Sequence, residues 1–131
     1  MDIEIRNVTL ADIDQLKHIG RRTFFETFSE GNTEENMAKY LEEGFSIEKL
    51  TKELNHPQTM FYFATQGSDV IGYVKLNFGQ AQTELWNEKA LEIERIYVLK
   101  DFHGTGMGQR LYTTAIQIAR EKKVEFVWLG V

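Results

Sequence analysis

Three glycines at alternate positions are the feature of this sequence best suited to binding a charged group. Gly104, Gly106 and Gly108 follow a β-rich run and precede a segment with helical spacing. Glycine permits positive φ and a close approach of a ligand, and the free N–H groups at the start of a helix attract anions with the help of the helix dipole. The pattern indicates a phosphate or diphosphate bound by main-chain amides.

The spacing of these glycines excludes two common phosphate-binding motifs. A dinucleotide-binding turn has the pattern G-x-G-x-x-G followed by an acidic residue, and a P-loop ends in G-K-[ST]. Residues 104–109 satisfy neither pattern. The sequence therefore disfavours a dinucleotide or a nucleoside triphosphate.

Two carboxylates precede the glycines in a run with the pattern of a strand. Glu92 and Glu94 are two residues apart, so they are predicted to share one face of that strand with Ile96 and Val98. An ordinary glutamate, with a pKa of about 4.3, is a poor base at neutral pH, and burial or a second carboxylate would have to raise that value. The pair is predicted to supply a general base. The alternative is a solvated strand face or a salt bridge, and which glutamate acts is left open.

Composition excludes several kinds of chemistry. Without cysteine the chain has no disulfide, no thiolate zinc site and no thiol for a covalent acyl intermediate. His18, His56 and His103 match no metal-ligand spacing, so no metal is predicted. A net charge of −5 without a basic run disfavours nucleic acid and favours cationic partners, although an acidic excess more often serves solubility alone.

The hydropathy of the chain predicts a cytoplasmic protein. Residues 1–6 include two acids where a signal peptide needs a basic start and an apolar run. No stretch approaches membrane-spanning length, so no membrane partner is expected.

A mixed α/β domain is predicted to position these groups. The chain has 131 residues, 42% of them hydrophobic, and shows no repeat or linker, which fits one domain with one core. Its last strand, helix and strand predict a parallel pair joined by a crossover. Strands are expected near residues 3–8, 60–66, 70–77, 91–98 and from about 124, and helices after Thr9, from Asn32 to 41, from Ser46 to about 55 and over 109–121.

The glycine segment resembles the acetyl-CoA signature of the GNAT N-acetyltransferases, [QR]-x-x-G-x-[GA]. Here it reads His103-x-x-Gly106-x-Gly108, with His103 at the usual Gln or Arg position. Residues 23–28, 35–37 and 91–97 look like the PaiA-type polyamine N-acetyltransferases, and the resemblance covers nearly the entire chain. It implies the GNAT acyl-CoA N-acyltransferase fold, an α/β (α+β) arrangement with a mixed central sheet flanked by helices.

The resemblance also implies roles for particular residues. The main chain of Ile96, Tyr97 and Val98 is expected beside the pantetheine arm of acetyl-CoA, with the Val98 N–H polarising the thioester carbonyl. Glu26 and Glu30 lie in the helical segment that shapes the acceptor site, where they are expected to bind a small-molecule polycation such as spermidine or spermine. Direct attack of this primary amine in a ternary complex is expected. The diphosphate is expected on the amides of Gly104, Thr105, Gly106, Met107, Gly108 and Gln109.

Two alternatives remain open at this point. The acceptor could instead be a protein N-terminus or a lysine, or the chain could be a non-catalytic acyl-CoA-binding regulatory module. Residues 126–131 are apolar to the end, and relatives carry a further segment with an Asn and a Phe-Tyr pair after the last strand. We therefore expect a single GNAT domain over 1–131 that is truncated after the fifth strand. The sequence leaves a homodimer open.

Overall fold

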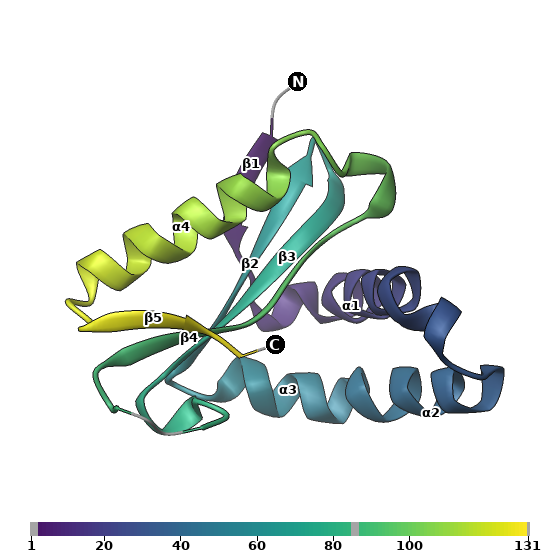
Figure 1. Ribbon diagram of the computed structural model, residues 1–131, viewed down its shortest axis with the longest axis horizontal. Coiled ribbons are helices and arrows are strands. Elements are labelled where there is room, and N and C mark those ends of the chain that lie inside the picture. Colours follow the sequence, from purple (N-terminus) through teal and green to yellow (C-terminus); the bar gives the residue numbers. More distant parts are fainter. Residues whose placement is uncertain (1–2, 85–86, 131) are drawn as a thin grey trace.

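The fold is built on a mixed five-stranded sheet in which the strands follow chain order. The structure, a computed structural model, describes residues 3–84 and 87–130 (Figure 1). Pairs from the first to the fourth strand are antiparallel, and the fourth and fifth strands are parallel, as the crossover predicted. The strands are β1 (Ile3–Asn7), β2 (Thr59–Gln66), β3 (Asp69–Phe78), β4 (Ala90–Val98) and β5 (Phe126–Leu129).

Helices cover both faces of this sheet. Figure 1 shows α4 on one side, and α1, α2 and α3 together on the other side. No helix in the described part of the chain is long and apolar enough to cross a membrane. The helices are α1 (Ile13–Phe28), α2 (Glu34–Gly44), α3 (Ile47–Asn55) and α4 (Met107–Glu121). The mixed α/β architecture expected from the sequence is confirmed.

Short polar side chains cap the N-termini of α2 and α3. The Thr33 hydroxyl accepts a hydrogen bond from the Asn36 N–H, and the Ser46 hydroxyl accepts one from the Lys49 N–H, both at 3.1 Å. These bonds satisfy N–H groups that the first turn leaves free. The predicted start at Asn32 is one residue early, because its side chain instead donates to the Phe28 carbonyl.

Each face of the sheet has its own layer of buried side chains. Phe61 and Tyr73 stack, with ring centroids 6.5 Å apart, on the face covered by α1 and α3. Leu76 and Ile93, which are opposite one another on β3 and β4, are fully buried on the α4 face, as is Leu111 of that helix. Burial of side chains of this size stabilises the fold by about 1.5–3 kcal/mol each, so the two layers fix the sheet between the helices.

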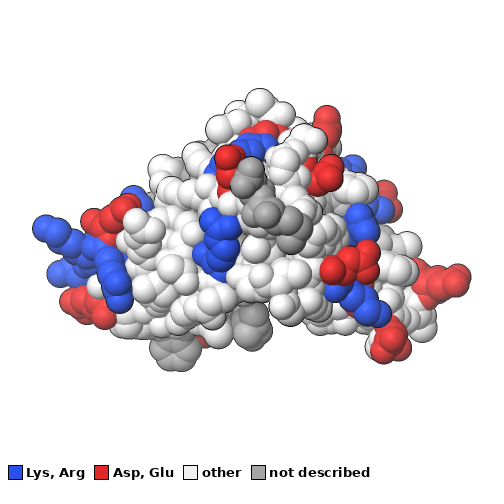
Figure 2. Space-filling view, turned by 90° about the horizontal axis from the view of Figure 1, so that it is seen from above, with Lys and Arg blue, Asp and Glu red and all other residues white. Residues whose placement is uncertain are grey.

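One group of charged side chains lies at the C-terminal end of α4. Figure 2 shows Lys and Arg gathered at the left end of this face, where α4 ends, with acids among them. Arg120 lies in the last turn of α4, and Lys122 and Lys123 follow it. Cations at a helix C-terminus interact favourably with the helix dipole.

A β-bulge interrupts β4 beside the predicted acidic pair. Lys75 of β3 is opposite Arg95, whereas the next residue, Leu76, is opposite Ile93, which leaves Glu94 as an extra residue on β4. An extra residue reverses the alternation of side chains in the rest of the strand.

The bulge corrects the prediction that the two glutamates share a face with Ile96 and Val98. Ile96 is opposite Val74, on the α4 face. Glu92 is opposite Asn77, on the face of α1 to α3, and the Glu94 carboxylate bonds to Asn77 on that same face. A strict period of two cannot anticipate the inserted residue, so the prediction was wrong at this point.

Candidate active site

The glycine segment folds as a short turn with open space above it. Gly104 and Gly106 have φ of +82° and +85°, a conformation that favours glycine. Gly106 is the N-cap of α4, which begins at Met107, so the helix starts two residues earlier than expected. A Cβ added at Gly104, Gly106 or Gly108 would have no atom of the described chain within 4 Å.

The amides at the start of α4 are available to a ligand. Among the described backbone hydrogen bonds, none is donated by Gly106, Met107, Gly108 or Gln109, as expected in the first turn of a helix. Thr105 differs, because its N–H donates to the Phe102 carbonyl at 3.3 Å. The Thr105 N–H, which was expected to bind the diphosphate, is therefore used within the turn.

His103 closes the turn against the end of β4. Its Nε2 donates a hydrogen bond to the Val98 carbonyl at 2.8 Å. The side chain at the usual Gln or Arg position therefore fixes the turn to the strand. A cavity of about 270 Å³, here called the turn cavity, is lined by Ile96, Val98, Phe102, His103, Gly104, Gly106, Met107 and Gly108.

The second half of β4 has an open edge next to this cavity. In the described residues the pairing of β4 with β5 ends at Ile93 and Leu129, and the Gly130 N–H then donates to the Ile93 carbonyl at 3.0 Å. An open strand edge can bind an extended ligand through main-chain hydrogen bonds. This edge and the free amides of α4 fit the amide-bearing arm and the diphosphate of acetyl-CoA.

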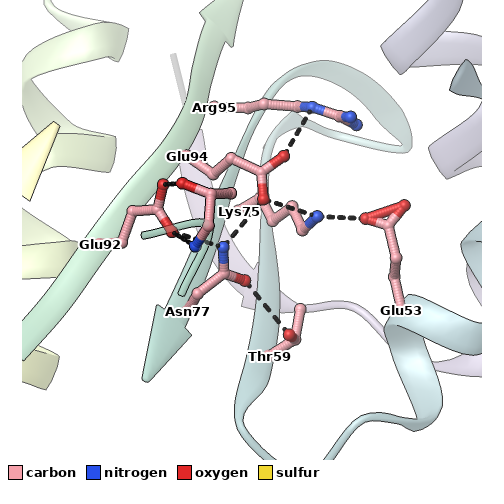
Figure 3. A network of polar contacts seen from close by, with 8 residues as sticks. Glu53, Thr59, Lys75, Asn77, Glu92, Glu94 and Arg95 are labelled. Atoms are coloured by element: carbon pink, nitrogen blue, oxygen red, sulfur yellow. Dashed lines mark hydrogen bonds and ion pairs between the residues drawn. The ribbon is translucent and has the colours of Figure 1, made fainter. Parts of the chain in front are cut away.

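One amide group brings the two predicted glutamates together. The Asn77 Nδ2 donates to an oxygen of Glu92 at 3.0 Å and to an oxygen of Glu94 at 2.9 Å (Figure 3). Glu92 is fully buried and also accepts hydrogen bonds from the N–H and the hydroxyl of Thr83. Its carboxylate is therefore held by Asn77 and Thr83.

Glu94 lies between two cations. Its carboxylate is 2.9 Å from the Lys75 Nζ and 3.5 Å from the Arg95 Nε. Burial alone would favour the neutral form, but the charge and hydrogen bond of Lys75, the Asn77 donor and the charge of Arg95 outweigh it, so the pKa of Glu94 lies below its ordinary value. The rise in pKa that a conventional general base needs is thus not found at Glu94.

Lys75 is a buried cation with two carboxylate partners. It also contacts Glu53 of α3, and the side chains of Lys75, Glu53 and Glu94 are only 8%, 13% and 16% exposed (Figure 3). Buried charges are stable only when they are paired and hydrogen-bonded. The three side chains therefore form one ionic unit that links α3 to the bulge of β4.

Aromatic side chains form a second cavity, on the face of the sheet that α1 to α3 cover. The Phe24 ring lies 4.7 Å from that of Phe28, 5.8 Å from that of Phe45 and 6.2 Å from that of Tyr40, measured between centroids. The cavity, here called the aromatic cavity, has a volume of about 560 Å³. It is lined by Phe24, Phe28, Tyr40, Glu43, Gly44, Phe45, Lys49, Thr83, Glu94, Arg95, Tyr97 and Gly130.

The predicted substrate residues lie outside this lining. The Glu26 carboxylate accepts a hydrogen bond from the Lys100 N–H at 2.9 Å and is 3.9 Å from Arg22, and Glu30 is exposed on a 3-10 turn. The carboxylates that line the aromatic cavity are Glu43 and Glu94. Tyr97, expected beside the cofactor, also lines the aromatic cavity.

Sequence reasoning missed the polar residues of β3 and α3. Lys75 and Asn77 alternate within a run of β3 whose residues are buried, and a lysine in such a run needs a partner. The position of Lys75 in an apolar strand therefore indicated a buried ion pair, although the sequence could not show that Glu53 would be the partner. Among the described residues, no group of three or more His, Cys, Asp or Glu side chains is arranged to hold a metal ion.

Comparisons with known proteins identify the family of this chain. Residues 13–131 match the acetyltransferase (GNAT) family. A relative from Lactobacillus delbrueckii subsp. lactis, described as an uncharacterized N-acetyltransferase in the pepI 3′ region, is 39% identical over 129 residues, which are 98% of this chain and 75% of the relative. The spermidine N(1)-acetyltransferase of Thermoplasma acidophilum is 26% identical over 128 residues, 95% of this chain and 74% of that protein.

Solved structures share the fold. The PaiA N-acetyltransferase of Thermoplasma acidophilum in complex with coenzyme A superposes with a TM-score of 0.82 at 24% identity, covering 95% of this chain and 76% of that chain. An aminoglycoside acetyltransferase, meta-AAC0020, from an uncultured soil metagenomic sample in complex with sisomicin has a TM-score of 0.74 at 20% identity, covering 98% and 77%.

Proposed function

The chain belongs to the GNAT family of acetyltransferases and is an acetyl-CoA-dependent N-acetyltransferase, and on this premise we propose that its acceptor is a polyamine such as spermidine or spermine. The residues that line the aromatic cavity are the main support for this proposal. Aromatic rings and carboxylates attract alkylammonium groups, and the cavity combines four aromatic residues of the helical layer and Tyr97 with two carboxylates, Glu43 and Glu94, beside the cations Lys49 and Arg95. The similarity to a spermidine N(1)-acetyltransferase supports the same substrate class.

The glycine turn and the edge of β4 would hold the cosubstrate. The free amides of Gly106, Met107, Gly108 and Gln109 suit the diphosphate, and the main chain of residues 96–98 suits the pantetheine arm. Acetyl-CoA, when bound, supplies an activated acetyl group as a thioester. We assign the Val98 N–H to polarise the thioester carbonyl.

The acceptor must lose a proton before it can attack. A primary ammonium has a pKa of about 10.4, so only about one molecule in 2,500 is neutral at pH 7. Glu94 lines the aromatic cavity and its carboxylate is ionised at neutral pH, so we assign it to receive this proton, directly or through water. Glu92 does not line the cavity, and we assign it to hold Asn77 and thereby to position Glu94.

A competition assay tests the proposed acceptor. The protein is incubated with acetyl-CoA and, in parallel, with spermidine, spermine, a peptide with a free N-terminus and a peptide with an internal lysine. Released thiol gives the rate, and mass spectrometry identifies the product. We expect kcat/KM for a polyamine to exceed that for either peptide at least about tenfold, a difference of about 1.4 kcal/mol in transition-state binding.

Two results would contradict the proposal. A preference for a peptide would assign the enzyme to protein amines. Thermal stabilisation by acetyl-CoA without any acetylated amine would indicate a module that binds acyl-CoA but does not transfer the acetyl group.

A further inference from the structure

The ionic unit of Lys75 connects the aromatic cavity to a third cavity. The third cavity, here called the α3 cavity, has a volume of about 300 Å³ and shares no lining residue with the aromatic cavity. Glu94 lines the aromatic cavity, whereas Glu53 and Lys75 line the α3 cavity. The full lining of the α3 cavity is Lys52, Glu53, His56, Thr59, Lys75, Asn77, Gln80 and Ala81.

The connection between the two cavities consists of direct contacts between ionisable groups. The Lys75 Nζ lies 2.9 Å from an oxygen of Glu94 and is hydrogen-bonded to an oxygen of Glu53 (Figure 3). The other oxygen of Glu53 is buried and has no hydrogen-bond partner among the described residues. Glu53 therefore binds Lys75 through one oxygen, which is the one that can receive a proton from Lys75 directly.

The stoichiometry of the proposed reaction requires a path for one proton. A protonated amine and acetyl-CoA give an amide, free coenzyme A and one H⁺, whereas a neutral amine gives the amide and coenzyme A with no net release of a proton. A polyamine that fills the aromatic cavity would displace water from Glu94, and the cations around Glu94 disfavour its protonated form. A proton received by Glu94 must therefore be passed on within each turnover.

We propose that Lys75 and Glu53 relay this proton from Glu94 to water in the α3 cavity, an inference that rests on the proposed function. The ammonium N–H bond breaks and an O–H bond forms on Glu94. Glu94 then gives its proton to the Lys75 nitrogen while Lys75 gives one of its own protons to Glu53. Glu53 releases the proton to water, so every side chain returns to its starting charge and no redox partner is needed.

Two other polar side chains of the described chain lie near this path, Asn77 and His56, and neither offers an equivalent one. Asn77 contacts Glu92 and Glu94, but its amide is not ionisable, so it positions the carboxylates. His56 lines the α3 cavity, but its Nδ1 already accepts the Gln58 N–H at 3.0 Å, so the neutral ring carries its proton on Nε2 and has no free lone pair. Water is thus the final acceptor.

The test compares two acceptors that differ in charge. The assay is run at about pH 7.5 with spermidine, whose primary amines are almost fully protonated, and with trifluoroethylamine, which is neutral. Glu53→Gln keeps the shape of the side chain and an oxygen for Lys75, but it cannot be protonated. Glu48→Gln is the matched control on α3, since Glu48 is exposed and pairs only with Lys52, at 3.7 Å, among the described charged groups.

We expect Glu53→Gln to lower kcat for spermidine at least about tenfold and to leave kcat for trifluoroethylamine within about twofold. Glu48→Gln should leave both unchanged. An equal loss with both acceptors would show that Glu53 acts only by positioning, and no loss with either would also overturn the relay.

Failure of the proposed function gives a different result. A wild-type protein that acetylates trifluoroethylamine and a protonated peptide amine but not spermidine would refute the polyamine assignment, and the peptide would then replace spermidine in the relay test. A wild-type protein that acetylates no amine would overturn both inferences, since no proton would be released.

Discussion

Replacement of the buried cation Lys75 by methionine should destabilise the protein strongly and in a pH-dependent manner. Methionine keeps the approximate length of the side chain but leaves Glu53 and Glu94 facing each other without their shared cation. Removing one partner of a buried ion pair usually lowers the free energy of unfolding by 3–5 kcal/mol, and the exposed fractions of 13% and 16% for these two glutamates place them in that class. We expect a loss of about 3–5 kcal/mol at pH 7, a large share of the 5–15 kcal/mol of a typical domain.

The pH dependence of this loss follows from Glu94. In the wild type its pKa lies below 4.5, so its contribution to stability is present above pH 4.5 and is lost as the pH falls through the lowered value. Without Lys75, only the Asn77 donor and the charge of Arg95 oppose burial, so the pKa of Glu94 should rise and the variant should gain less stability than the wild type as the pH rises. The difference between wild type and Lys75→Met should therefore be smallest below pH 4.5 and largest near pH 7.

Urea unfolding followed by tryptophan fluorescence, at about pH 3.5 and about pH 7, measures this difference. The double variant Lys75→Met, Glu53→Gln removes the carboxylate that has no other cation and keeps Glu94 beside Arg95, so it should regain part of the loss. A loss below about 1 kcal/mol at pH 7, or an equal loss at both pH values, would show that the three side chains are not a buried ionic unit.

Three further variants test other parts of the structure. Gly108→Ala should raise the melting temperature, since alanine favours a helix by up to about 1 kcal/mol. It should weaken coenzyme A binding in calorimetry at least about tenfold, because the new methyl group would occupy the open space above the turn. Unchanged affinity would exclude this backbone from the diphosphate site. Gly20→Ala places a Cβ 2.6 Å from the Phe45 ring and should lower the free energy of unfolding by about 1–3 kcal/mol, with a raised KM for the amine; a variant as stable as the wild type in urea would contradict this packing. Glu43→Gln should raise KM for spermidine about three- to tenfold with little change in kcat, and steady-state kinetics showing no change in KM would remove Glu43 from the amine site.

Local patterns predicted much of the fold because they depend on near neighbours. The turn at Gly67 joins β2 and β3 as the sequence indicated, and the glycines before α4 lie where the strand and helix patterns meet. The capping box of Thr9 and Asp12 is also present, although it opens a 3-10 turn before α1. Each of these features is determined within a few residues of the chain.

The arrangement of the site was harder to predict because it depends on distant partners. Glu26 was expected to bind the amine, but a main-chain N–H 74 positions away occupies one of its oxygens. Lys75 pairs with a glutamate 22 positions earlier in the chain, and no local pattern fixes such a pair. The bulge at Glu94 arises from the register of β3 against β4, which a single strand cannot reveal.

The bulge lets β4 hold one more carboxylate than a regular strand could place there. If Glu94 were deleted, Ile93 could stay opposite Leu76 and Arg95 opposite Lys75, so the flanking side chains would keep their faces. The strand would then be regular but would lack the carboxylate that contacts Lys75. Any transplant of this strand between related enzymes must therefore keep the inserted residue together with its neighbours.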